Sequence, residues 1–460
     1  MTPKKFDMVV ATTPSGGIGI NGGMAWRCLD ELKLFRRITL EPEHGVVLVG
    51  RTTYATLPPL LNRRIMVLTS SGTPPPSGQP ATVVHSIQEA LELTDKKVCV
   101  CGGGKVYETA LETPERIGTL YVSVMKEEFK CDTSVKIPWD LFKIESKIDH
   151  PEFTHYQLKY DAGGERRYLS LLRTVSATGE TVHGRNGSVK SLFGNTLTFN
   201  LLNGFPLLTT RKMFWKGVVL EFLMFVRGEI DTQCLSTNGV GIWTGNTSTA
   251  FQSSIGKGDY DEGIMGPMYG MQWRHFNGQW SRKRDGTHPS GGVDQLANVI
   301  NLIKTDPSSR RIMMVTLNPC QVDDGVLPPC HSIAIQFSVR ERTPEFAGYL
   351  DMICFNRSQD LVLGTPFNIA SSALLLTCVA KICGLTPRNL IMNLGDCHVY
   401  ALHLDTLRTQ LDRPRFSFPT LKLTGLDGDL TLSKLETLGL ENFQLEGYQC
   451  HPALKFDMVA

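Results

Sequence analysis

The fold of the first half of the chain is indicated by one segment, Lys97-Val98-Cys99-Val100-Cys101-Gly102-Gly103-Gly104-Lys105-Val106-Tyr107. It begins with a short, mostly apolar run typical of a buried strand, and the residues after the glycines begin a helix. The other apolar runs of this kind are Phe6–Ala11, Val46–Val49 and Ile65–Thr69, and the helix candidates are Leu29–Ile38 and Ile87–Leu93. Strands that alternate with helices predict an α/β domain with a largely parallel sheet.

Two of these predicted strands are followed by residues that are suited to binding anions. Glycines after Val100 allow backbone N–H groups to approach a pyrophosphate at a helix N-terminus. Gly50–Tyr54 follows another strand and supplies a cation and two hydroxyl groups. Taken singly, the first could be a plain tight turn and the second a capped helix with a solvated Arg51. Together they favour a phosphorylated dinucleotide as the ligand.

The helix predicted over Leu29–Ile38 carries a candidate acid. Leu32 and Phe35 share one face, and Glu31 lies at the edge of that face. A carboxylate in the first turn is commonly no more than a partner of the helix dipole. A carboxylate that faces an apolar cleft is a candidate proton relay.

Charge and cysteine content limit the function classes. The 460 residues carry 47 basic and 45 acidic side chains, which excludes nucleic-acid binding by bulk electrostatics. No apolar run reaches the roughly 18 residues of a membrane span. The 12 cysteines show no metal-ligand spacing, so we expect no metal site and reduced thiols in the cytoplasm.

The sequence pattern changes near Asp161–Gly164. A new helix is predicted to open at Glu165. We therefore expect a first domain over residues 1–160, a short linker over 161–164 and a second domain over 165–460.

The strongest single site in the second half is Leu327-Pro328-Pro329-Cys330-His331. Most cysteines in such chains are inert core residues, and a nucleophilic cysteine needs a thiolate form. Several arginines could supply positive charge, although each alone is most simply a surface residue: Arg185, Arg310, Arg311 and Arg357. If they converge, they would bind a phosphate dianion and favour a nearby thiolate.

Two further stretches fit a pocket for a small polar ligand. Gly395–Tyr400 offers the rings of His398 and Tyr400 with the alternation of a strand. Pro366–Ser371 carries Asn368 into an apolar helix, where an asparagine is commonly a cap but could also read a pyrimidine edge.

The first half resembles dihydrofolate reductase over residues 6–160. The motifs that carry the resemblance are Ile18-Gly19, Met24–Trp26, Phe35–Thr39, Gly50–Tyr54, Asn62–Arg64 and Gly102–Tyr107. The resemblance implies that NADPH delivers hydride to dihydrofolate. Glu31, with Asp30 as the fallback, takes the family's acidic position beside the pterin, and Arg63 would hold the glutamate carboxylate of the folate.

The same resemblance implies two sets of binding residues. The NADPH set is Ala11, Ile18, Gly19, Arg51, Thr52, Thr53, Ser70, Gly103, Gly104, Lys105 and Val106. The folate set is Glu31, Leu32, Phe35, Leu57, Arg63 and Ser123.

The second half resembles thymidylate synthase from about Glu165 to Ala460, so a mixed sheet with helices (α+β) is expected. The further motifs are Pro206–Thr210, Glu221–Gly228, Ile242-Trp243, Gly266-Pro267 and Tyr269-Gly270. The order of the two halves resembles the bifunctional enzyme of protozoa and plants. It implies methylation of dUMP with 5,10-methylenetetrahydrofolate in a homodimer built through the second domain.

The resemblance also assigns roles in the second half. Cys330 would be the nucleophile, with Glu221, Tyr269 and His398 assisting. The residues implied to bind dUMP are Arg185, Arg310, Arg311, Arg357, Ser358, Asp360, Asn368, His398 and Tyr400, with Arg310 and Arg311 coming from the partner subunit. Those implied to line the folate face, Asp360 among them, are Trp243, Leu327, Gly364 and Phe367.

Several residues depart from the family patterns. Ala25 replaces a proline before Trp26, Gln359 replaces the cysteine after Arg357-Ser358, and Ile264 and Leu402 replace polar residues. One alternative is therefore that only one half is active and the other is a dimerisation or RNA-binding scaffold. The retained Cys330 and arginine set favour catalysis, because a scaffold has no need of clustered like charges.

Overall fold

The computed structural model describes residues 4–71, 79–161, 163–184, 187–426 and 428–458. The chain divides into two compact units. The first comprises Met1–Ala162 with Pro414–Phe416, and the second comprises Gly163–Arg413 with Ser417–Ala460. Residues 414–416 lie within the range predicted for the second domain but belong to the first unit.

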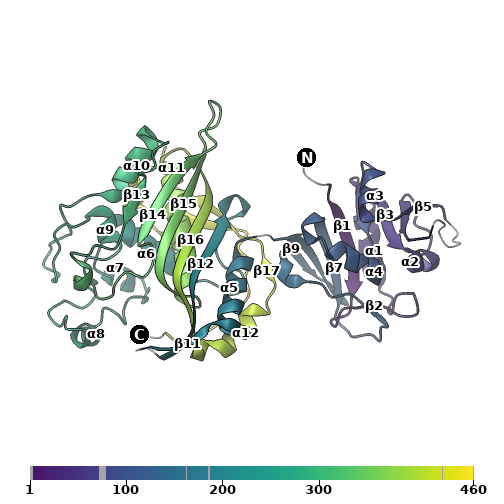
Figure 1. The fold of residues 1–460 in the computed structure, drawn as a ribbon, viewed down its shortest axis with the longest axis horizontal. Helices are drawn as coiled ribbons and strands as arrows, with labels where there is room; N and C mark the ends of the chain where they lie inside the picture. Colours follow the sequence, from purple (N-terminus) through teal and green to yellow (C-terminus); the bar gives the residue numbers. More distant parts are fainter. Residues whose placement is uncertain (1–3, 72–78, 162, 185–186, 427, 459–460) are drawn as a thin grey trace. The chain divides into compact units, whose positions relative to one another are not determined.

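The first unit is built on a nine-stranded sheet (Figure 1). In order across the sheet its strands are β17 (Arg415–Phe416), β9 (Phe142–Asp149), β10 (Phe153–Tyr160), β7 (Ile117–Met125), β1 (Phe6–Thr12), β6 (Lys97–Val100), β3 (His44–Gly50), β4 (Arg64–Leu68) and β5 (Ala81–Val84). Only the pairings of β10 with β7 and β9 are antiparallel. The prediction of a largely parallel α/β sheet is confirmed.

Four helices accompany the strands of the first unit: α1 (Leu29–Thr39), α2 (Arg51–Thr56), α3 (Ile87–Glu92) and α4 (Gly104–Leu111). α1 matches the predicted helix, but Leu32 is not part of its buried side. Leu34 and Ile38 are the buried apolar residues, whereas Leu32 is 47% exposed. Leu32 and Phe35 instead line a cavity, because that side of α1 meets the carboxyl ends of the strands.

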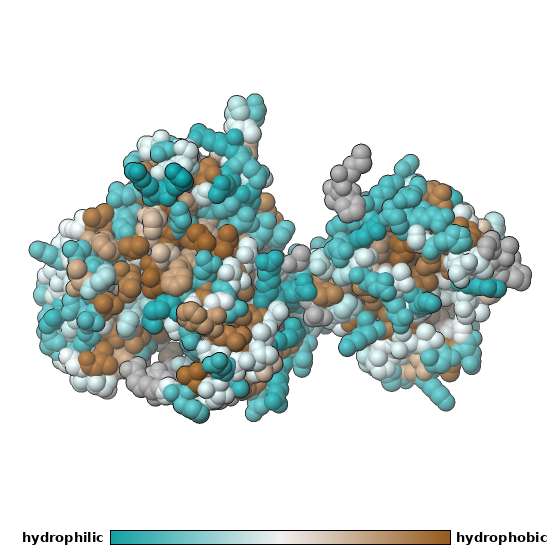
Figure 2. All heavy atoms as spheres, in the orientation of Figure 1, coloured by the Kyte–Doolittle hydropathy of each residue, from teal (hydrophilic) through white to brown (hydrophobic). Residues whose placement is uncertain are grey.

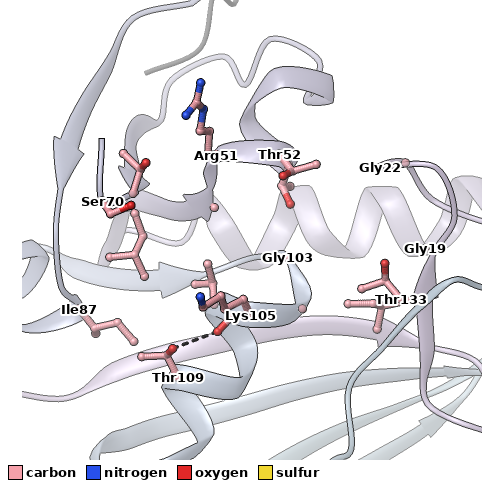
Figure 3. A pocket seen from close by; sticks show the side chains of 18 of the residues that line it. Gly19, Gly22, Arg51, Thr52, Ser70, Ile87, Gly103, Lys105, Thr109 and Thr133 are labelled. Atoms are coloured by element: carbon pink, nitrogen blue, oxygen red, sulfur yellow. Dashed lines mark hydrogen bonds between the residues drawn. The ribbon is translucent and has the colours of Figure 1, made fainter. Parts of the chain in front are cut away.

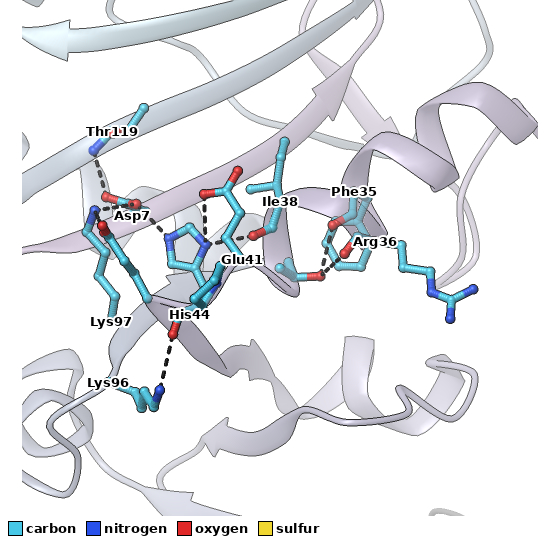
Figure 4. A network of polar contacts seen from close by, with 12 residues as sticks. Asp7, Phe35, Arg36, Ile38, Glu41, His44, Lys96, Lys97 and Thr119 are labelled. Carbon is cyan, nitrogen blue, oxygen red and sulfur yellow. Dashed lines mark hydrogen bonds and ion pairs between the residues drawn. The ribbon is translucent and has the colours of Figure 1, made fainter.

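The amino ends of β1, β3 and β6 hold a buried charge network (Figure 4). One carboxylate oxygen of Asp7 lies 2.8 Å from His44 Nε2 and 3.1 Å from Lys97 Nζ. The other oxygen accepts the Thr119 N–H, and His44 Nδ1 lies 2.6 Å from the Ile38 carbonyl. These contacts pair a carboxylate that is fully buried, and they lie at the end of the sheet opposite to the glycine turn.

The second unit contains a six-stranded mixed sheet, as predicted. In order its strands are β11 (Glu180–Gly184), β12 (Gly187–Asn200), β16 (Thr386–Tyr400), β15 (Tyr349–Asp360), β14 (Ala334–Arg340) and β13 (Met313–Val315). β15 and β16 run parallel and the other neighbours run antiparallel. A separate ribbon pairs β18 (Thr420–Leu423) with β19 (Phe443–Glu446).

The principal helices of this unit are α5 (Glu165–Thr178), α6 (Trp215–Arg227), α9 (Gly270–Arg274), α10 (Gln295–Thr305), α11 (Gly364–Ile382) and α12 (Leu404–Leu411). α11 connects the parallel strands β15 and β16 and packs on both and on α6. Among the described residues it is the one helix long and apolar enough to cross a membrane. Its apolar side chains are instead buried in the core of the unit.

Candidate active sites

A cavity of about 650 Å³ opens at the carboxyl ends of the parallel strands in the first unit (Figure 3). Ten of the eleven residues predicted to bind NADPH line it, from Ile18 and Gly19 through Arg51 and Ser70 to Lys105 and Val106. The eleventh, Ala11, lines the neighbouring cavity. The structure therefore brings the two predicted anion-binding strand ends together, because β3 and β6 are adjacent in the sheet.

The glycine turn lies against the start of α2. A Cβ on Gly103 would come within 2.8 Å of the Thr53 hydroxyl, and one on Gly104 within 2.9 Å of Thr133. No side chain caps the first turn of α4. Its free N–H groups and the nearby cations of Arg51 and Lys105 fit the pyrophosphate of a dinucleotide.

A second cavity of about 360 Å³ shares Ile18, Thr53 and Gly103 with the first. It is lined by five of the predicted folate residues: Glu31, Leu32, Phe35, Leu57 and Arg63. The sixth, Ser123, is buried on β7 and hydrogen-bonds Glu31 from behind. Glu31 is the carboxylate within this apolar lining, and burial raises its pKa to about 7 despite the Ser123 hydrogen bond.

Asp30, the fallback acid, lies outside the cavity. It is exposed to solvent and pairs with Lys33 at 2.9 Å, which lowers its pKa. Of the two carboxylates, Glu31 is therefore the one that lines this cavity. At the far end of the cavity Arg63 donates to Thr39 Oγ1 at 2.9 Å, and burial together with the neighbouring Arg36 lowers its pKa.

In the second unit Cys330 lies in the loop between β13 and β14. Its Sγ is 3.4 Å from Tyr269 Oη, and the same hydroxyl accepts the Cys330 N–H at 3.1 Å. Burial raises the pKa of the thiol, while the Tyr269 hydrogen bond and the Arg357 charge act in the opposite direction. Tyr269 is held by ring stacking on His331 and Phe225.

Glu221 and Trp243, predicted to act in different parts of the site, contact each other directly. Trp243 Nε1 donates to Glu221 Oε1 at 2.7 Å. Burial raises the pKa of Glu221 to about 7. A carboxyl group poised at that value can both donate and accept a proton near neutrality.

The parallel register of β15 and β16 joins two predicted motifs. Ser358 pairs with Asp396, and Asp360 pairs with His398. The Ser358 N–H donates to the Cys330 carbonyl at 3.1 Å, which ties the nucleophile loop to the end of β15. Arg357 donates to the carbonyls of Pro328 and Pro329 on the same loop.

His398 and Tyr400 lie on one face of β16. His398 Nδ1 is 2.7 Å from Asp396 Oδ1, which fixes the ring, and the rings of His398 and Tyr400 meet edge to face. Both line a cavity of about 270 Å³ together with Gly184 and Gly187. Arg185, predicted to bind phosphate, lies between those two glycines and outside the described residues.

The start of α11 carries the remaining predicted residues. Asp360 Oδ1 accepts the N–H groups of Val362 and Leu363 in the turn that precedes the helix. Asn368 lies in the second turn and is buried, so it is not the cap. Phe367 and Leu327 are half-buried at the edge of the core, and Gly364 is the first residue of the helix.

Arg310 and Arg311 are not brought to the Cys330 of their own chain. Both are exposed, and they precede β13. Val315 pairs with Ala334 in the antiparallel ladder of β13 and β14. Arg311 precedes Val315 by four residues and Cys330 precedes Ala334, so the two residues lie on opposite sides of this pair. At about 3.3 Å per strand residue, those four residues alone span about 13 Å.

Comparison with known proteins agrees with this geometry. The dihydrofolate reductase family model matches residues 5–164, and the thymidylate synthase family model matches residues 166–460. Three relatives, each named a bifunctional dihydrofolate reductase-thymidylate synthase, match nearly the whole chain. They come from Paramecium tetraurelia (33% identical, 100% of this chain and 99% of the relative), Daucus carota (33%, 99% and 96%) and Leishmania major (34%, 99% and 95%).

The chain belongs to the bifunctional dihydrofolate reductase–thymidylate synthase family. It reduces dihydrofolate with NADPH, and it methylates dUMP with 5,10-methylenetetrahydrofolate. Both enzyme domains are present, so the alternative of a single active half beside a scaffold is not favoured.

Some residues of the reductase cavities were missed by sequence reasoning. They are Gly22, Gly23, Leu68, Thr69, His85, Ser86, Ile87, Thr109 and Thr133 in the larger cavity, and Met24, Arg36, Thr56 and Leu60 in the smaller one. His85 and Ser86 follow β5, which was not among the predicted strands. The rule that ligands bind at the carboxyl ends of parallel strands would have found them had that strand been recognised.

The family departures have different structural settings. Ile264 is buried in the core, its N–H donates to the Asp261 carbonyl at 3.0 Å, and its carbonyl accepts from Gln252 Nε2 at 3.0 Å. Leu402 is exposed on a short turn beside His403, whose Nε2 lies 2.8 Å from the Asp457 carbonyl in the C-terminal tail. Gln359 alone among these three hydrogen-bonds a predicted substrate residue, Asn368.

Proposed function

We propose that the residues assembled around the two reductase cavities carry the first activity. The diphosphate of NADPH binds at the start of α4 and beside Arg51, and the nicotinamide reaches the smaller cavity past Ile18. The cofactor supplies the hydride. Dihydrofolate lies along Leu32, Phe35 and Leu57 with its glutamate carboxylate on Arg63. The support is the continuity of the two cavities, which share Ile18 and Gly103.

Glu31 is the proton source for the pterin ring. It is the buried acid of the apolar cavity, and its raised pKa of about 7 keeps a substantial protonated fraction near neutrality. The carboxyl group hydrogen-bonds the pterin and assists protonation of the ring nitrogen next to the carbon that receives hydride. Ser123 holds the carboxyl group from behind.

In the synthase, Cys330 is the nucleophile. Its sulfur forms a bond to C6 of dUMP, and the electron pair moves to C5, which attacks the one-carbon group of methylenetetrahydrofolate. Loss of the C5 proton breaks the bond between the methylene carbon and the folate nitrogen and leaves an exocyclic methylene group on the base. Tetrahydrofolate then gives hydride to this carbon and becomes dihydrofolate, and the Cys330 thiolate departs from C6. Glu221 and His398 move the protons, Glu221 through water, and Tyr269 donates or accepts next to the sulfur.

Different residues of the site bind the phosphate, the deoxyribose and the base of dUMP. Arg357 and Ser358 hold the phosphate with Arg185, while His398 and Tyr400 hold the deoxyribose hydroxyl. Asn368 reads the uracil edge, because an amide offers one donor and one acceptor to its O4 and N3–H. Asp360, Trp243, Leu327, Gly364 and Phe367 line the folate face.

The synthase acts as a homodimer in which Arg310 and Arg311 bind the phosphate in the partner subunit. Two observations support this. The arginines are exposed and are held away from their own Cys330 by the β13 register. The sheet face turned away from α11 also exposes apolar side chains, among them Met313 and Phe355, and brown residues gather over β14 to β16 in Figure 2.

A cytoplasmic setting suits the chemistry. All 12 cysteines are free, including the nucleophile, and a reducing compartment keeps Cys330 available as a thiol. The reductase activity is assigned to residues 1–160 and the synthase activity to residues 165–460, although residues 414–416 belong to the first unit.

The contact between Cys330 Sγ and Tyr269 Oη carries the synthase assignment, and a trapping experiment tests it. Incubation with 5-fluoro-dUMP and methylenetetrahydrofolate should leave a covalent adduct on the peptide that contains Cys330. Cys320→Ser, which removes an exposed cysteine, should leave the adduct unchanged, and Cys330→Ser should abolish it. An adduct on another cysteine, or none, would sink the assignment.

A further inference from the structure

Gln359 is a buried amide that connects the end of β15 to α11. Its side chain is 1% exposed. Its Nε2 donates to the Ser358 carbonyl at 3.1 Å, and its Oε1 accepts from Thr365 Oγ1 at 3.0 Å and from Asn368 Nδ2 at 3.2 Å. The family pattern has a cysteine at this position, which could not make this set of contacts.

The Ser358 carbonyl fixes the orientation of the Gln359 side-chain amide. A carbonyl oxygen can only accept, so the NH₂ group must face Ser358 and the oxygen must face α11. The oxygen in turn can only accept, so Asn368 must present its NH₂ group to Gln359. A flipped Asn368 would set two amide oxygens against each other in a buried site, and the Asn368 oxygen would have no donor there.

This polarity decides what Asn368 offers to a ligand. Within the described part of the chain, Asn368 Oδ1 has no hydrogen-bond partner, and it is not among the fully buried unpaired atoms. Uracil presents a donor at N3 beside an acceptor at O4, whereas cytosine presents an acceptor at N3 beside a donor at N4. An asparagine that is free to flip can pair with either base, because its oxygen and nitrogen exchange places at almost no steric cost.

We propose that Gln359 is a positioning residue that locks the Asn368 amide in the orientation that pairs with uracil, and that it thereby sets the preference for dUMP over dCMP. The inference rests on the proposed role of Asn368 as the reader of the pyrimidine. Gln359 does not contact the nucleotide. It acts through Asn368 alone, with Thr365 holding the Gln359 oxygen from the side.

The test is binding of dUMP and of dCMP to the full-length chain by calorimetry. The two nucleotides share phosphate and sugar, so the ratio of their dissociation constants isolates the base. Gln359→Met keeps the volume and removes both amide groups. We expect it to lower the preference for dUMP roughly five- to tenfold, which is the size of one lost hydrogen bond. Thr365→Val leaves the Ser358 and Asn368 contacts in place and should change the ratio less than about twofold.

The outcomes separate this inference from the assignment of Asn368. Asn368→Ala should remove most of the preference; if the ratio stays at the wild-type value, the proposed reader is wrong. If Asn368→Ala abolishes the preference but Gln359→Met weakens both nucleotides equally, Gln359 is merely structural and the inference is overturned. Should Gln359→Met fail to fold, Gln359→Asn retains the amide but is too short to span from Ser358 to Asn368, and the same loss of preference is expected.

Discussion

Glu31 and Asp30 are adjacent in the sequence, but their carboxylates differ in burial and in pKa. Glu31 is buried with a pKa raised to about 7, whereas Asp30 is exposed and paired with Lys33. A proton donor of this kind makes hydride transfer fall as the pH rises above about 7. Glu31→Gln should remove that dependence and lower the rate roughly a hundredfold or more. Single-turnover NADPH oxidation against pH measures both, and Asp30→Asn is the matched control that should leave the profile unchanged.

The same residue affects stability in a predictable direction. A carboxyl group whose pKa is raised by folding destabilises the native state as the pH rises from about 4.5 through about 7. Glu31→Gln should therefore stabilise the reductase unit by up to about 3 kcal/mol above pH 7, and should change little below pH 4.5. Urea unfolding of the variant at the two pH values checks this. Equal stability of variant and wild type at pH 8 would show that Glu31 is not desolvated.

We expect Tyr269 to influence the reactivity of Cys330. Its hydroxyl is the hydrogen-bond partner of the sulfur and lowers the thiol pKa against the effect of burial. Tyr269→Phe should raise that pKa, so alkylation of Cys330 by iodoacetamide at neutral pH should slow severalfold. Tyr260→Phe removes another largely buried hydroxyl, bonded to the Asp324 carbonyl, and should leave the alkylation rate unchanged. Equal slowing in both variants would point to a general packing effect.

Among the secondary-structure elements, the amino ends of β1, β3 and β6 are connected by contacts of the Asp7 carboxylate. Burial raises the pKa of Asp7, but the His44 hydrogen bond and Lys97 outweigh this effect. Burial lowers the pKa of His44, but the hydrogen bond to Asp7 and the contacts with Cys99 and the Ile38 carbonyl outweigh it. The pKa of His44 reaches about 10 and that of Asp7 is lowered. The His44 contribution is therefore complete below about pH 6.5 and lost as the pH rises through about 10, and the Asp7 contribution is present above about pH 3.8.

Asp7→Asn should destabilise the reductase unit by about 3–5 kcal/mol at pH 7, because it leaves His44 and Lys97 without their buried partner. Pulsed labelling of the buried Cys99 on β6 during urea unfolding reports this unit alone. Glu43→Gln, which removes only the exposed partner of Lys97, should change the stability by less than about 1 kcal/mol. A difference between Asp7→Asn and wild type that persisted undiminished above pH 10 would contradict the account.

The elements also show what the sequence could and could not predict. The parallel sheet, α1 and the glycine turn follow from apolar runs and turn residues, and the motifs around Cys330 follow from family resemblance. β5 was missed because it is short and follows a loop rich in Pro, Gly and Ser. Periodicity alone could not show which side of α1 packs in the core, because Leu32, which lines the smaller cavity, is as apolar as Leu34, which is buried. The Gln359 contact to Asn368 could not be predicted, because it depends on how α11 folds back on β15.

At the scale of the whole molecule, the dimer proposal predicts complementation between two inactive chains. Cys330→Ala lacks the nucleophile, and Arg311→Ala lacks a phosphate ligand that it supplies to the partner subunit. A mixed dimer then holds one intact site and one doubly defective site. Co-refolding the two inactive variants in equal amounts should restore synthase activity to about a quarter of the wild-type level, since half of the dimers are mixed. No restoration, with dimers present by light scattering, would place Arg311 outside the site.

The central claim is that one chain makes dTMP and recycles the dihydrofolate that this reaction releases. The most direct measurement supplies purified protein with dUMP, methylenetetrahydrofolate and NADPH, and follows dTMP, dihydrofolate and NADPH together. One NADPH should be oxidised for each dTMP formed. Glu31→Gln should still form dTMP but accumulate dihydrofolate, and Cys330→Ala should form no dTMP. Formation of dTMP by the wild-type chain without oxidation of NADPH, or oxidation of NADPH with added dihydrofolate but no dTMP, would contradict the central claim.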